Sequence, residues 1–190
     1  MPFLQKIQAM DEKSLQGEFE NLLPELENRV AKAVELFNQG FNCSQSVVAA
    51  FADFYDFSRD QALRMSASFG GGIGRMRQTC GAACGLFLLA GLETGTTDSS
   101  DKEGKNRNYA QVRKFAGDFQ AINGSLICAE LLASEKQPEL LSPSKPMHFH
   151  YAKKHCDRMV ESAARLFAHY LICRRIADKA PQAFCPQSPK

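Results

Sequence analysis

The sequence contains no long apolar run and nothing that resembles a secretory signal. Its longest apolar stretch, LFLLAGL at residues 86–92, is far too short to cross a bilayer. The opening residues, MPFLQKIQAMDEK, have neither an apolar h-region nor a small-residue cleavage site. We therefore expect a cytoplasmic protein without a membrane span, in which cysteines stay reduced unless they are catalytic, redox-sensing or metal-bound.

An excess of charge of either sign is also lacking. The 190 residues include 23 basic and 21 acidic side chains, which gives a formal net charge of +2. A nucleic-acid surface needs clustered lysines and arginines, and no such cluster occurs, so no nucleic-acid partner is expected. Apolar residues make up 44% and charged residues 23%, as is typical of one soluble domain of ordinary size.

No C-x-x-C pair occurs, which excludes a thioredoxin motif and a zinc ribbon, and no C-x-x-C-H occurs, which excludes c-type haem attachment. Seven cysteines are nevertheless many for a cytosolic chain of this length. Because seven is odd, at least one thiol lacks a disulfide partner within the chain. The cysteines are Cys43, Cys80, Cys84, Cys128, Cys156, Cys173 and Cys185.

The spacing of apolar residues predicts an all-α single-domain bundle of about six or seven helices, with no strand. Pro24 suits the first turn of one helix, and Ser58 with Gln61 and Ser100 with Glu103 form capping-box patterns at two others. The expected helices span about 24–40, 42–55, 58–69, 79–93, 100–122, 126–133 and 149–178, and residues 3–22 are a further candidate.

The domain organisation expected from these patterns has three parts. Residues 1–25 form an N-terminal helical extension, residues 26–178 form a helical cysteine-rich redox domain, and residues 179–190 form a disordered tail. Within the domain, three prolines predict a loop over residues 134–147.

Three of the cysteines fall at predicted helix starts: Cys43, Cys80 and Cys128. Free N–H groups and the helix dipole favour negative charge there, and can lower a thiol pKa from about 8.5 to roughly 3.5–7.5. Cys80, which follows the expected cap Thr79, is therefore the candidate attacking thiol. Gly81 and Gly85 leave space close to this turn for another helix or a ligand.

A cysteine can also be a small buried residue without chemistry. We expect this of Cys173, which extends an apolar stripe of the last helix, and we expect Cys185 to be a tail thiol. Cys84 lies four residues after Cys80 on the same helix face, so it suits either interpretation. Cys156 lies early in the last helix, and we expect it to share a pocket with Cys43, Cys80 and Cys128.

Four stretches in order resemble the C-GCAxxG-C-C family, described as redox-active. They are GFNCSQSVVAAF, FGGGIGRMRQTCGAACG, NGSLICAELL and CDRMVESAA. The family signature is a CGAxxG segment, which falls on residues 80–85, and three further cysteines, which fall on Cys43, Cys128 and Cys156. The resemblance covers about residues 28–170 and implies a small helical redox protein. A related segment in split-Soret-type cytochromes has been suggested to bind an iron–sulfur site.

Three chemistries remain open for this site. In the first, Cys43, Cys80, Cys128 and Cys156 exchange thiols and disulfides, or electrons, with a redox partner protein. In the second, the same four cysteines are the ligands of an iron–sulfur cluster or another metal, although their spacing of 37, 48 and 28 residues matches no compact ligand run. In the third, the GGGIGRMR segment binds an anion or small molecule without catalysis.

Several other residues are candidates for the same site. Arg75 or Arg77 is the expected charged contact for an anion or a thiolate, with Gly81 and Gly85 beside it. Tyr109 and Asn123 are further lining candidates. His148, His150 and His155 are expected at the surface, although a histidine beside Cys156 could instead be a ligand or a proton partner. A homodimer is possible for a helical chain of this size, although no long heptad demands one.

Overall fold

The computed structural model describes residues 12–133 and 149–179, and the regular elements within these residues are all helices. The prediction of an all-α fold with about seven helices and no strand is confirmed for this part of the chain. None of the described helices is long and apolar enough to span a membrane. In chain order the elements are α1 (Glu12–Asn38), α2 (Cys43–Phe51), the 3-10 turn η2 (Ala52–Tyr55), α3 (Arg59–Ser66), the 3-10 turn η3 (Ala67–Phe69), α4 (Gly81–Thr94), α5 (Lys102–Asn123), α6 (Cys128–Ala133) and α7 (Phe149–Lys179).

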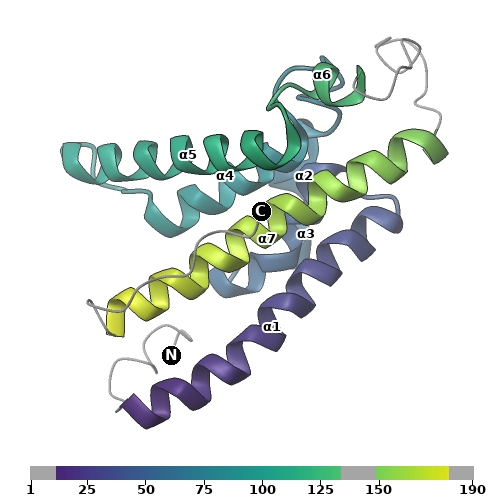
Figure 1. The fold of residues 1–190 in the computed structure, drawn as a ribbon. Coiled ribbons are helices and arrows are strands. Elements are labelled where there is room, and N and C mark those ends of the chain that lie inside the picture. Colours follow the sequence, from purple (N-terminus) through teal and green to yellow (C-terminus); the bar gives the residue numbers. More distant parts are fainter. Residues whose placement is uncertain (1–11, 134–148, 180–190) are drawn as a thin grey trace.

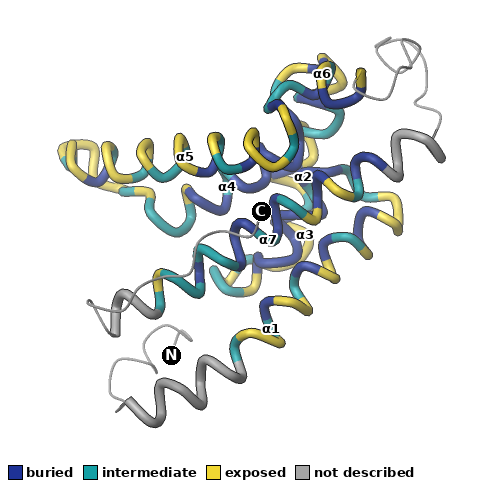
Figure 2. Tube along the Cα trace, viewed as in Figure 1, coloured by how far each residue is buried: buried dark blue, intermediate teal, exposed yellow. Residues whose placement is uncertain are grey.

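Helix α2 lies at the centre of the bundle, packed against α1, α3, α4 and α7 (Figure 1). The long helices α1 and α7 lie side by side, and α4 and α5 form a second pair that also packs on α7. Figure 2 shows the buried residues concentrated where these helices face one another. Because α2 is short and surrounded, eight of its nine residues are buried.

Aromatic rings from three helices meet in the core. The Phe167 ring of α7 lies 5.1 Å from that of Phe51 at the end of α2 and 6.4 Å from that of Phe115 in α5. All three side chains are at most 2% exposed. Edge-on and tilted ring pairs of this kind add to the free energy gained by burying apolar area, so they fix the relative positions of α2, α5 and α7.

Local sequence signals set most helix starts. Asn42 caps α2 and forms a capping box with Gln45, and the predicted box of Ser58 with Gln61 is present at the start of α3. The prediction that a helix begins at Pro24 is wrong, because α1 runs without a break from Glu12 to Asn38 and contains Pro24. The three-part division of the chain stays a prediction.

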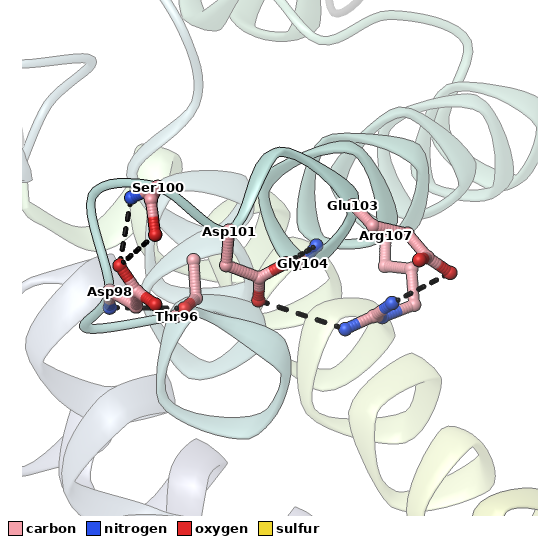
Figure 3. A network of polar contacts seen from close by, with 7 residues as sticks. All are labelled: Thr96, Asp98, Ser100, Asp101, Glu103, Gly104 and Arg107. Carbon is pink, nitrogen blue, oxygen red and sulfur yellow. Dashed lines mark hydrogen bonds and ion pairs between the residues drawn. The ribbon is translucent and has the colours of Figure 1, made fainter.

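The predicted capping box of Ser100 with Glu103 is wrong by one residue. Asp101 caps α5 instead, and its carboxylate accepts a hydrogen bond of 2.7 Å from the Gly104 amide (Figure 3). Ser100 donates from its amide and hydroxyl to Asp98 at 2.8 and 2.7 Å, so it closes the preceding turn. A carboxylate suits a helix start better than a hydroxyl because it also meets the positive end of the dipole.

Two glycines let α4 approach α2 closely. A methyl group on Gly85 would lie 3.0 Å from Val47 Cβ and 3.1 Å from the Ser44 carbonyl oxygen, and one on Gly81 would lie 2.7 Å from the Phe69 carbonyl oxygen. These neighbours are backbone or rigid atoms that cannot easily move. The absence of side chains at Gly81 and Gly85 is therefore a packing requirement.

We expect Gly85→Ala to lower the free energy of unfolding by about 1–3 kcal/mol, because the added methyl group overpacks the contact between α4 and α2. The matched control is Gly91→Ala on the same helix, where an added Cβ meets nothing within 4 Å. This control should raise stability by about 0.5–1 kcal/mol, since alanine is the better helix former. Urea unfolding measures both changes, and equal effects at the two positions would contradict this account.

Candidate functional site

Four cysteines far apart in the sequence line one cavity of about 590 Å³. They come from α2, the start of α4, α6 and α7, and each is at most 9% exposed. They are Cys43, Cys80, Cys128 and Cys156. The structure thus brings together the four positions singled out from the sequence. What they do there stays a prediction.

A short backbone ladder places the starts of α4 and α6 side by side. The Cys80 amide donates to the Leu126 carbonyl at 2.8 Å, and the Cys128 amide donates to the Gln78 carbonyl at 2.7 Å. Thr79 pairs with Ile127 in the antiparallel bridge between these two contacts. Thr79 is therefore not the helix cap that the sequence predicted, because Cys80 itself occupies the cap of α4.

Asn42 connects the start of α2 to the segment that precedes this ladder. Its carboxamide oxygen accepts from the Gln45 amide at 3.0 Å, and its nitrogen donates to the Ala67 carbonyl at 2.8 Å. Gly70 lies directly against Asn42, where an added Cβ would lie 2.7 Å from the carboxamide. This contact holds Cys43, the first residue of α2, against the glycine-rich wall of the cavity, which is formed by the segment 70–77.

The glycine-rich wall turns with left-handed backbone geometry. Every residue from Gly71 to Arg75 has a positive φ, and Arg77 has a φ of 60°. Ile73 is a β-branched residue, for which a positive φ is a true outlier. An added Cβ on Gly72 would lie 2.6 Å from Cys128 Cβ, so a glycine is needed at this point of contact.

The thiols of Cys43 and Cys156 lie close enough to shift each other's pKa. The interaction with Cys43 lowers the pKa of Cys156, helped by the positive charge of Arg77, although burial and Asp157 oppose the change. The same interaction, followed by burial, raises the pKa of Cys43. Of the two thiols, Cys156 is therefore the one that ionises more readily.

The expectation that a helix start lowers the pKa of Cys80 is wrong. Burial raises the pKa of Cys80 to about 12, and the amides of Ala82 and Ala83 only partly offset it. The Cys80 thiol makes no conventional capping hydrogen bond, which is consistent with a weak effect of these amides. Burial also raises the pKa of Cys128, despite the opposing charge of Arg77.

Arg77 is the charged residue that the cavity encloses. It is 7% exposed, and its positive charge lowers the pKa of both Cys128 and Cys156 against the effect of burial. Arg75, the arginine we favoured from the sequence, also lines the cavity, but it is exposed. Both arginines have a positive φ, and no periodic pattern in the sequence distinguishes the buried one from the exposed one.

Several predictions for the histidines and for further cavity-lining residues are wrong. His155 is 9% exposed and lines the cavity, so its expected surface position is wrong. Tyr109 is 57% exposed and does not line the cavity. Asn123 accepts a hydrogen bond from Ser162 outside the cavity. His148 lies outside the described residues, and the side chain of His150 is not described.

Cys84 and Cys173 are not among the residues that line the cavity. Cys84 is buried one turn after Cys80, and burial raises its pKa to about 11. Cys173 is disulfide-bonded, so the expectation that it is only a packing residue is wrong. Cys185 lies outside the described residues.

A metal ion or cluster would need several of these side chains to face one centre. Four thiols in one cavity are a suitable donor set for a cluster. However, the described residues contain no group of three or more His, Cys, Asp or Glu side chains placed to hold a metal ion. The ligand role of these cysteines stays a prediction.

We expect Cys156 to ionise before the other cavity thiols as the pH rises, because its pKa is lowered while those of Cys43, Cys80 and Cys128 are raised. The ultraviolet absorbance of thiolates against pH, in reduced protein, measures this order. Cys156→Ser should remove the first step. Cys43→Ala should move that step to higher pH, since the interaction with Cys43 that lowers the pKa of Cys156 is lost. Cys84→Ser is the control, and a first step lost in this variant instead would contradict the assignment.

Comparisons with known proteins agree with this cysteine pattern. A family model described as "Putative redox-active protein (C_GCAxxG_C_C)" matches residues 41–170. An "Uncharacterized protein" of Archaeoglobus fulgidus is 30% identical over 116 residues, which cover 57% of this chain and 77% of that protein. No solved structure matches. Because the match spans more than half of the chain and all four cavity cysteines, the chain belongs to the C_GCAxxG_C_C redox-active protein family.

Proposed function

We propose that this protein carries out dithiol–disulfide exchange, with Cys43 and Cys156 as the reacting pair. The observation that carries the proposal is that these two thiols line one cavity, are both free and shift each other's pKa. Two neighbouring sulfurs can close a disulfide without large movement of the helices that hold them. Because both thiols are free, the structure shows this pair in its reduced state.

The charges around the pair give the two cysteines different tasks. Cys156 is the nucleophile, because the positive charge of Arg77 and the interaction with Cys43 stabilise its thiolate. Cys43 is the resolving thiol. Cys80 was the nucleophile favoured by the sequence, but its raised pKa makes it a poor attacking group at neutral pH.

The exchange proceeds in two displacements. The Cys156 thiolate attacks one sulfur of a substrate disulfide, so a mixed disulfide forms and the other substrate sulfur leaves as a thiolate with the bonding electron pair. That thiolate takes up the proton of Cys43. The Cys43 thiolate then attacks the Cys156 sulfur and releases the second substrate sulfur as a thiolate, which takes up a proton from water. The substrate gains two electrons and the protein dithiol becomes a disulfide.

Arg77 and the neighbouring thiols support this step. The positive charge of the guanidinium lowers the pKa of Cys128 and attracts the negative charge on Cys156. Cys80 and Cys128 lie in the same cavity, within electrostatic range of the pair. The family signature includes both residues, so a role as further exchange partners for the Cys43–Cys156 disulfide is part of the proposal.

We expect the reduced protein to form a Cys43–Cys156 disulfide on treatment with the neutral reagent hydroxyethyl disulfide. Cys43→Ser should stop at the mixed disulfide on Cys156, because the resolving thiol is absent, and Cys156→Ser should form neither product. Cys84→Ser is the matched control and should react as wild type does. Peptide mass spectrometry after acid quenching identifies each product.

The alternative hypothesis, that these cysteines bind a metal or an iron–sulfur cluster, is tested in the same preparation. Protein purified without oxygen is analysed for iron, sulfide and zinc, and its free thiols are counted. Stoichiometric metal, with Cys43 and Cys156 unreactive until it is removed, would overturn the dithiol proposal. Metal-free protein whose pair closes on oxidation supports it.

A further inference from the structure

The reacting sulfurs lie too deep for a disulfide on the rigid surface of another protein. Cys43 and Cys156 are 8% and 9% exposed, and the route to them is the cavity of about 590 Å³. A volume in the range of roughly 300–1,000 Å³ is usual for pockets that enclose a small molecule. The size of the cavity therefore favours a small disulfide as the molecule that reaches the pair.

The charged side chains that line the cavity are both arginines. Arg75 lies exposed in the lining and Arg77 is buried in it, and no aspartate or glutamate is among the described lining residues. In the described part of the chain Arg77 forms no ion pair with a carboxylate, and its Nε has no hydrogen-bond partner. Arg77 acts on the Cys156 thiolate, but its buried Nε still lacks an acceptor, and a buried donor without an acceptor is unfavourable.

Backbone donors lie on the same wall. Gly71 and Gly72 line the cavity, and within the described residues their amides donate to no protein acceptor, whereas each amide from Ile73 to Gln78 donates to a carbonyl. Successive amides in a left-handed turn are a common way to bind an anion. Two free amides and a free Nε on one wall are a set of donors without an acceptor.

We infer that the cavity takes a small disulfide that carries a carboxylate group, with Arg77 and the amides of Gly71 and Gly72 as the donors that bind the carboxylate. This inference rests on the proposed dithiol function and specifies its substrate class. The carboxylate holds the substrate while the Cys156 thiolate attacks its sulfur. The products are two small thiols that carry carboxylates and the Cys43–Cys156 disulfide, so two electrons pass from the protein to the substrate.

The test compares three small disulfides of similar size with the reduced full-length protein. Dithiodipropionate is anionic, hydroxyethyl disulfide is neutral and cystamine is cationic. The measured quantity is the rate of Cys43–Cys156 disulfide formation, divided by the rate at which each reagent oxidises a simple model thiol. This ratio removes differences in intrinsic reactivity. We expect the normalised rate to be about tenfold or more higher for dithiodipropionate than for the other two.

The variants separate binding from thiol activation. Arg77→Gln should slow all three reagents, because the thiolate loses a cation, and should also abolish the preference for the anion. Arg77→Lys should restore part of that preference. Arg113→Gln removes the same charge from an exposed site on α5 and should keep the wild-type preference. Because the preference is measured first in the wild-type protein, the test does not depend on whether the Arg77 variants fold.

The other outcomes would overturn either this inference or the proposed function. Equal normalised rates for the three reagents in the wild type, or a faster reaction with a disulfide on a folded protein, would overturn this inference while the dithiol function stands. No disulfide between Cys43 and Cys156 with any reagent would overturn the proposed function itself.

Discussion

The short ladder between residues 77–80 and 126–129 is the constraint on which the site depends. It joins two segments about 50 residues apart and sets the first residues of α4 and α6 next to each other. Its carbonyls and amides are the groups that a loop would otherwise have to leave to water. With the ladder in place, Cys80 and Cys128 face the same space, and α2 and α7 complete the enclosure.

Burial and nearby charge have opposite effects on the thiol pKa values of the site. Burial raises the pKa of Cys80, Cys84 and Cys128 more than local interactions lower it. At Cys156 the interactions with Cys43 and with the positive charge of Arg77 outweigh burial, so the pKa is lowered. Helix starts alone do not decide which thiol ionises, since amides without good hydrogen-bond geometry offset little of the cost of desolvation.

Sequence reasoning succeeded where the controlling interaction is local. Helical periodicity and the box of Ser58 with Gln61 depend on residues three or four positions apart, and both are present. It failed at Pro24, where packing of the α1 helix overrides a local start signal. The burial of Arg77 and His155 could not be predicted from the sequence. It depends on a left-handed turn and on helix packing, which the spacing of residues does not indicate. The meeting of the four cysteines was anticipated from their positions at or near helix starts and from the family pattern.

Each thiol of the site belongs to a different structural element. Its reactivity can therefore report how often that element separates from the bundle. A sulfur that is at most 9% exposed can react with a bulky alkylating reagent only when the element that covers it moves away. The labelling rate at each position therefore measures how often α2, the start of α4, α6 or α7 separates from the bundle. These labelling rates would rank the helices by local stability without the introduction of any new cysteine.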